Sequence, residues 1–102
     1  MWVRVSTFAA EPGTDSSRFR EDAEKVRDKL LPQAEALEGF KGMMMVADSQ
    51  SGQSMSFTFW DTEDAMRSSE EAANQLRKQS SEETGEAIVD VRRYEVLIDD
   101  RR

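Results

Sequence analysis

The stretch FTFWDTEDA, residues 57–65, predicts a strand that runs directly into a helix. Phe57 and Phe59 alternate with small polar residues, which is the period-two pattern of a half-buried strand. Either of the two residues after Trp60, an aspartate and a threonine, can cap a helix with its side-chain oxygen, and the acidic residues that follow favour the positive end of the helix. Trp60 therefore stands at a strand-to-helix corner, where a cleft between sheet and helix would open.

The rest of the chain supplies the other elements of the fold. Four strands are expected, over residues 2–9, 40–48, 53–60 and 87–98. The first helix, capped by Asp15, Ser16 or Ser17, carries an apolar stripe at spacings of three and four: Phe19, Ala23, Val26, Leu30, Ala34 and Leu37. Pro32 should kink this helix or split off its last turns. The second helix is expected over residues 62–80.

The order β-α-β-β-α-β predicts one α+β domain over residues 1–102. Right-handed crossovers make it a ferredoxin-like, four-stranded antiparallel sheet with two helices on one face. Neighbouring apolar residues such as Met43 and Met44 must point to opposite faces, so the uncovered face is partly apolar. We therefore expect a homodimer that buries this sheet face, closed by two-fold symmetry.

Composition excludes several classes of function. The chain has no cysteine and no histidine, which removes thiolate chemistry, a Ser-His-Asp triad and the commonest metal and haem ligands. A net charge of −7 argues against nucleic acid or an anionic membrane as a partner. The chain has neither a long apolar run nor a secretory signal, which leads us to expect a cytoplasmic protein.

Two runs, LEGFKGM at residues 37–43 and FWDTEDA at residues 59–65, resemble the antibiotic biosynthesis monooxygenase family of dimeric α/β barrels. The resemblance implies a ferredoxin-like fold, a dimer, and a pocket in each subunit between sheet and helices. Some members of that family oxygenate aromatic polyketides without metal or flavin, and others degrade haem.

The resemblance to the haem-degrading members is incomplete. Trp60 falls where their pocket tryptophan stands. Ser6 falls where they use an asparagine, and the place of their proximal histidine is near Glu70. Two of the three features are changed, so haem degradation is not expected, and we expect no cofactor and no metal.

The remaining interpretation is a cofactor-independent monooxygenase that acts on a small aromatic or quinol-type metabolite. Trp60 could stack on the ring, and Tyr94 could donate a hydrogen bond. An oxyanion could be stabilised by Arg4, or by Arg92 or Arg93 on the last strand, if one of them points into the pocket, and Glu70 could act as a base. The residues expected to contact the substrate are Trp60, Ser6, Phe57, Met66 and Phe8. Two alternatives stay open: a non-catalytic module that binds a small ligand, and an accessory dimer in which Trp60 merely plugs the core and the arginines form salt bridges at the dimer rim.

Overall fold

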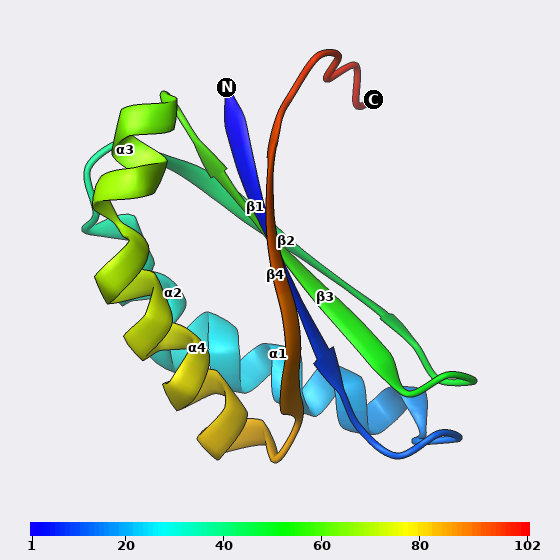
Figure 1. The fold of residues 1–102 in the computed structure, drawn as a ribbon. Coiled ribbons are helices and arrows are strands. Elements are labelled where there is room, and N and C mark those ends of the chain that lie inside the picture. Colours follow the sequence, from blue (N-terminus) through cyan, green and yellow to red (C-terminus); the bar gives the residue numbers. More distant parts are fainter.

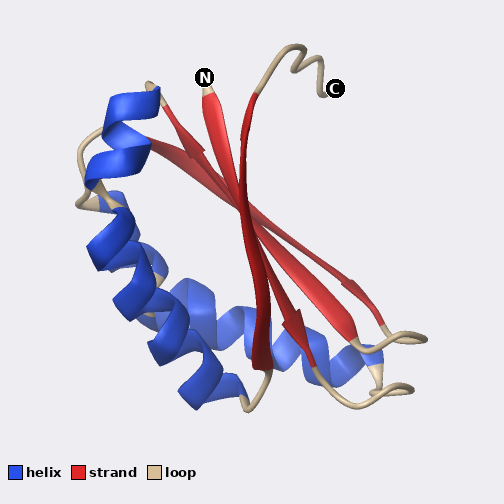
Figure 2. Ribbon diagram, viewed as in Figure 1, coloured by secondary structure: helices blue, strands red, loops and turns tan.

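The computed structural model describes residues 1–102 as one four-stranded sheet covered by helices on one face. The elements, in chain order, are β1 (Trp2–Ala9), α1 (Ser16–Lys29), α2 (Leu31–Glu35), β2 (Phe40–Asp48), β3 (Gln53–Trp60), α3 (Glu63–Ser68), α4 (Glu70–Thr84) and β4 (Ala87–Glu95). The sheet has the order β2-β3-β1-β4 with every pair antiparallel. All helices lie on one side of it (Figure 1), and the other side carries none (Figure 2). The predicted ferredoxin-like fold is confirmed, and no helix has the length and apolar character needed to cross a bilayer.

The first helical arm is divided in two, as Pro32 predicted. Asp15 caps α1 by accepting a hydrogen bond from the backbone N–H of Ser17 at 2.8 Å. α1 then ends at Lys29 and α2 begins at Leu31. Proline has no N–H to donate and is tolerated only in the first turn of a helix. Pro32 therefore lies in the first turn of a new helix rather than in the middle of a long one.

The second helical arm differs from the single helix predicted over residues 62–80. Thr62 caps α3, accepting from the N–H of Ala65 at 3.1 Å. The arm then divides around Ser69, and α4 continues to Thr84. The carbonyl oxygen of Met66 accepts hydrogen bonds from the side chains of Arg4 and Ser69, both at 2.7 Å. These two donors provide hydrogen bonds to a carbonyl group in the last turn of α3, where the helical hydrogen-bond pattern stops before α4 begins.

The register of β1 and β3 decides which residues face the helices. Arg4 lies opposite Thr58 and faces the helices, since its side chain bonds to α3. Val5 lies opposite Phe57 and faces the uncovered side. Phe57 and Phe59 therefore point away from the helices, and Thr58 between them points toward them.

The two runs that carried the family resemblance meet at one corner of the molecule. The N–H of Asp61 donates to the carbonyl oxygen of Gly39 at 2.8 Å. Gly39 has a φ of 78°, and a Cβ there would collide with the Cβ of Ala65, so only glycine fits. Phe40 packs edge-on against Trp60, with ring centroids 5.5 Å apart. These contacts fix the start of α3 against the end of α2.

The last strand is shorter than the predicted 87–98. β4 pairs only with β1, and Glu95 lies opposite Trp2, where β1 begins. The N–H of Val96 still donates to the carbonyl oxygen of Met1 at 2.9 Å, but no neighbouring strand extends further. Leu97 and Ile98 therefore lie outside the sheet, 84% and 86% exposed.

Candidate functional site

A cavity of about 70 Å³ lies between the helices and the sheet. Most of the residues that line it are apolar, and α1, α2, β2 and α4 supply most of these; Val26, Ala34, Met43 and Leu76 are examples. Its polar residues come from β1, β3 and α4: Arg4, Ser6, Ser56, Thr58, Arg77 and Ser80. No carboxylate lines it. The cavity therefore suits a small, largely apolar molecule with few polar groups.

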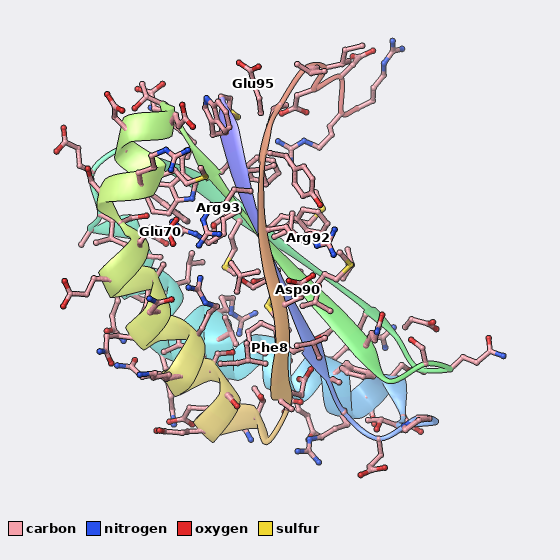
Figure 3. The ribbon with its side chains drawn as sticks, in the orientation of Figure 1. Phe8, Glu70, Asp90, Arg92, Arg93 and Glu95 are labelled. Atoms are coloured by element: carbon pink, nitrogen blue, oxygen red, sulfur yellow. The ribbon has the colours of Figure 1, made fainter.

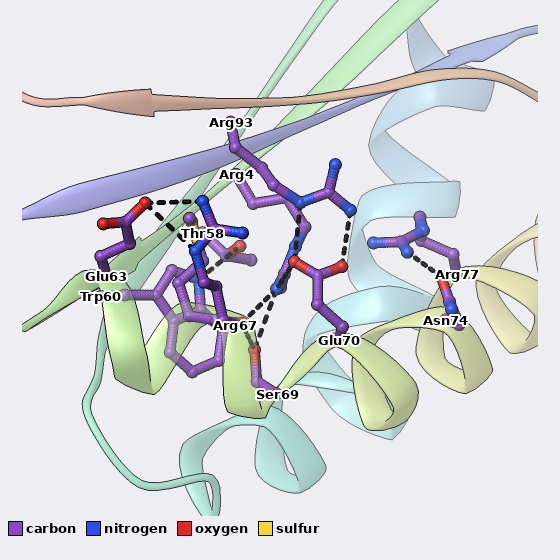
Figure 4. Close-up of polar contacts among 11 residues, drawn as sticks. Arg4, Thr58, Trp60, Glu63, Arg67, Ser69, Glu70, Asn74, Arg77 and Arg93 are labelled. Atoms are coloured by element: carbon purple, nitrogen blue, oxygen red, sulfur yellow. Dashed lines mark hydrogen bonds and ion pairs between the residues drawn. The ribbon is translucent and has the colours of Figure 1, made fainter.

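Arg4 links the cavity to the break between α3 and α4. The side chain is 2% exposed, and its Nη2 lies 2.7 Å from the carbonyl oxygen of Met66, 3.0 Å from Ser69 Oγ and 2.8 Å from Glu70 Oε1 (Figure 4). Its Nε is buried and has no hydrogen-bond partner. The guanidinium carbon lies 5.3 Å from the ring centroid of Trp60, within cation–π distance. Arg4 thus holds a positive charge against an aromatic wall.

Trp60 occupies the predicted corner between sheet and helix. It is 1% exposed and lines the cavity. Its Nε1–H donates to Thr58 Oγ1 at 3.1 Å, so the polar edge of the indole is satisfied within β3. Together with the edge contact from Phe40, this bond fixes the ring orientation. A ring held in this way is pre-organised to contact an aromatic ligand.

Glu70 is the anchor for two arginines. Arg93 of β4 reaches across to it, with Nε 2.7 Å from Oε1 and Nη2 2.6 Å from Oε2 (Figure 3). Hydrogen bonds from Arg93, and then from Arg4, lower the pKa of Glu70 from 4.5 to about 2 despite its partial burial. A carboxylate with such a pKa is a weak proton acceptor at neutral pH. This geometry favours a role in positioning Arg4 over the predicted role as a base.

The structure brings together four of the eight predicted site residues. Trp60, Arg4, Ser6 and Phe8 all line the cavity. Glu70 contacts the cavity only through Arg4. Met66 is fully buried but does not line the cavity.

The other two predicted site residues lie on the uncovered face of the sheet. Phe57 is opposite Val5, and Tyr94 is opposite Val3. Both are therefore outside the cavity, because a shift of one residue along a strand moves a side chain to the other face. Arg92 is on this face too and pairs with Asp90 at 2.7 Å (Figure 3).

Sequence reasoning missed Arg77, which enters the cavity wall from α4. The residue is 8% exposed. Burial lowers its pKa, and repulsion from Arg4 lowers it further. Arg77 lies four residues after Ala73, which also lines the cavity, so helical spacing was the available signal. No group of three or more aspartates and glutamates is placed to hold a metal ion.

Comparison with curated proteins finds relatives of unassigned function. No family model matches the chain. An uncharacterized protein of Mycobacterium tuberculosis is 28% identical over 97 residues, and the same is true of its counterpart in a second strain. The match covers 95% of this chain but only 39% of the relatives, so the chain spans about two-fifths of their length.

Solved structures match the whole fold at low sequence identity. A monooxygenase from the gene ActVA-Orf6 of Streptomyces coelicolor, in complex with nanaomycin D, aligns with a TM-score of 0.65 at 14% identity over 97% of this chain and 92% of that one. SnoaB, a cofactor-independent oxygenase from Streptomyces nogalater, aligns with a TM-score of 0.62 at 10% identity over 96% and 94%. A candidate antibiotic biosynthesis monooxygenase from Deinococcus radiodurans aligns with a TM-score of 0.59 at 19% identity over 100% and 98%. The chain therefore has the fold of the antibiotic biosynthesis monooxygenases.

Proposed function

We propose that this protein binds a small phenol or hydroquinone in the cavity beside Trp60 and oxygenates it without a cofactor. The observation that carries the proposal is the cavity wall itself, where an unpaired N–H of buried Arg4 lies next to a fixed indole ring. An aromatic ring has an apolar wall to contact, and an oxyanion on that ring has a buried cation nearby. The fold shared with a cofactor-independent oxygenase adds support.

The reaction needs no external reductant. A hydroquinone that loses a proton can pass electrons to dioxygen. One oxygen atom then forms a bond to a ring carbon in place of hydrogen, and the other leaves as water with the two hydrogens that the hydroquinone gives up on oxidation. One methylhydroquinone and one dioxygen thus give one hydroxylated methylquinone and one water. The protein's tasks are to stabilise the anion and to exclude bulk water.

The test is oxygen incorporation from ¹⁸O2 into methylhydroquinone, followed by mass spectrometry. We expect the hydroxyquinone with one labelled atom, formed well above the rate without protein. Trp60→Phe should lower this rate at least tenfold, whereas Tyr94→Phe on the uncovered face should leave it unchanged. Plain autoxidation gives the unhydroxylated quinone and hydrogen peroxide. Only that product, at equal rates with and without protein, would refute the proposal.

A second candidate function is binding without turnover. It is favoured by the absence of a proton acceptor from the cavity wall, since Glu70 contacts two arginines and lies outside the wall. A substrate would then have to ionise without a protein base. Saturable binding of methylhydroquinone under air, with no labelled product, would select this function.

We also propose that a second copy of the chain covers the open face of the sheet. An apolar groove there includes Val3, Val5 and Phe57, and it continues onto Leu97 and Ile98 of the tail. Two such faces in two-fold contact would bury each other's apolar side chains and give each exposed tail an apolar surface. Light scattering should give twice the chain mass of 11.6 kDa. Phe57→Glu should give a monomer, and a monomeric wild type would contradict the dimer.

A further inference from the structure

Arg77 is a buried cation without a carboxylate partner. Its Nη2 donates to Asn74 Oδ1 on the same helix, and this is its one hydrogen bond within the protein (Figure 4). It forms no salt bridge, although it is 8% exposed. Its charged neighbours are Arg4, Arg93 and Glu70, and Glu70 is already bound by the two arginines.

Two guanidinium groups bind one carboxylate at this end of the molecule and a third lies near it, in a chain whose net charge is −7. A charge removed from water without a counter-ion is unfavourable, so buried arginines are normally paired. Burial and the repulsion from Arg4 both lower the pKa of Arg77, as expected for a guanidinium that has no carboxylate partner. Arg77 lines the cavity, so an anionic group of a ligand bound there can pair with it.

We propose that Arg77 binds a carboxylate of the ligand, so that the cavity selects a single-ring aromatic carboxylate with its ring near Trp60. This inference rests on the proposed function for the identity of the ring. A carboxylate is planar, and a guanidinium can give it two parallel hydrogen bonds. The Nε and Nη1 of Arg77 make no bond within the protein.

The wall around Arg77 agrees with a small ligand of this kind. Ser80 lies three residues further along α4 and lines the same cavity, which offers a hydroxyl group on the same side of the helix. The cavity of about 70 Å³ is far smaller than the roughly 300–1,000 Å³ of sites for drug-sized ligands. A single ring is therefore a better fit than a fused polycycle.

A neutral analogue of the ligand would leave Arg77 unpaired, and a site built around a buried polar group discriminates strongly against such analogues. The matched probes are 2,5-dihydroxybenzoate and methylhydroquinone, which differ only in a carboxylate and a methyl group on the same ring. Calorimetric titration under argon keeps binding separate from oxygenation. We expect the carboxylate to bind at least tenfold more tightly than methylhydroquinone to the wild type.

Variants of α4 assign the preference to Arg77. Arg77→Gln should abolish the tenfold preference, and Lys78→Gln, a change at the exposed neighbouring residue, should retain it. Equal affinity of the wild type for both probes, or a preference that persists in Arg77→Gln, would overturn the proposal. Carboxylate-selective binding without ¹⁸O incorporation would leave the role of Arg77 intact and refute the oxygenase. Oxygenation of methylhydroquinone without any preference for the carboxylate would support the oxygenase and refute the role of Arg77.

Thermal unfolding gives a second readout that a purely structural role would not produce. Because Arg77 is unpaired in the free protein, Arg77→Met should melt no lower than the wild type. Addition of 2,5-dihydroxybenzoate should raise the Tm of the wild type but not that of Arg77→Met. A large loss of Tm in ligand-free Arg77→Met would mean that Arg77 holds the fold together, and it would contradict the assignment.

Discussion

Two glutamates that flank α4 have opposite electrostatic environments. Glu70, at the start of the helix, accepts hydrogen bonds from Arg4 and Arg93, and its pKa falls to about 2. Glu86, just past the end of the helix, accepts a hydrogen bond from Ser54 Oγ at 2.6 Å. Burial raises the pKa of Glu86, and the nearby carboxyl group of Asp22 raises it further. The surroundings thus stabilise the ionised form of the glutamate at one end and shift the glutamate at the other end toward its neutral form.

The contrast between the two glutamates indicates where an anionic ligand can bind. The end with Glu70 carries excess positive charge, the Arg77 guanidinium without a carboxylate partner, and the ring of Trp60. The end with Glu86 carries two buried carboxyl groups, and only Arg18 pairs with one of them, at 3.2 Å from Asp22. The two ends of the helix-covered face therefore differ in sign, and the positive end is the one that adjoins the cavity.

Removal of the Glu70 charge should have the largest effect on stability. Glu70→Gln leaves Arg4 buried beside a neutral amide, and we expect a loss of about 2–3 kcal/mol in the free energy of unfolding. Urea denaturation at pH 7 measures it. Glu71→Gln, at the exposed neighbouring residue, should change stability by less than about 0.5 kcal/mol. Equal effects of the two substitutions would mean that the arginine cluster does not stabilise the fold.

Protonation of Glu70 at low pH should remove the stabilisation that its charge gives to the folded protein. Since the pKa of Glu70 is about 2 in the folded protein and 4.5 ordinarily, the unfolded chain takes up this proton first. The stabilisation is complete above pH 4.5 and is lost as the pH falls toward 2, with a slope of at most about 1.4 kcal/mol per pH unit for this group. Urea denaturation across this range should show a shallower slope in Glu70→Gln than in the wild type. Identical slopes would contradict the lowered pKa.

Glu86 should show the opposite sign. Because its pKa is raised on folding, the folded protein holds this proton longer than the unfolded chain, and stability falls as the pH rises through that pKa. Glu86→Gln mimics the neutral acid and should gain on the order of 1 kcal/mol at alkaline pH. Glu82→Gln, at an exposed position of α4, serves as the control. A loss of stability in Glu86→Gln at pH 8 would show that the ionised form is the one the fold stabilises.

The smallest effect is expected at the partner of Asp22. Arg18 is more than half exposed, although it also donates to the carbonyl oxygen of Thr84 at 2.7 Å. The arginine end of this pair is in water, which screens the interaction even though Asp22 is buried, so Arg18→Gln should lower the free energy of unfolding by only about 0.5 kcal/mol. Urea denaturation of this variant beside Arg20→Gln measures the difference. A loss as large as that in Glu70→Gln would remove the contrast between the two ends.

The order of elements was predictable because it depends on local signals. Alternation marked the strand at residues 53–60, Pro32 marked the division between α1 and α2, and Thr62 was one of two expected caps. These signals act over a few residues, so a single sequence contains them in full. The resemblance to the antibiotic biosynthesis monooxygenases agreed with them, and the fold is confirmed.

The site was only partly predictable because its composition depends on contacts between distant strands. Alternation shows that Phe57 and Phe59 share a face, but pairing with β1 decides which face the helices cover. The structure gives that side to Ser56 and Thr58, whose hydroxyls line the cavity with Arg4. The pairing of β4 with β1 likewise places Tyr94 on the uncovered face, and β4 ends at Glu95 because β1 begins at Trp2.

Both proposed activities require the ligand to bind in the cavity between sheet and helices, and the methionines of β2 and β3 can report on its position. Met43 and Met45 line the cavity, whereas Met44 and Met55 face the other side of the sheet. The measurement is an NMR titration of protein labelled with ¹³C in the methionine methyl groups, using methylhydroquinone under argon. We expect saturable shifts at Met43 and Met45 and none at Met44 and Met55. Shifts confined to Met44 and Met55, or no saturable shift at Met43 and Met45, would contradict binding in the cavity.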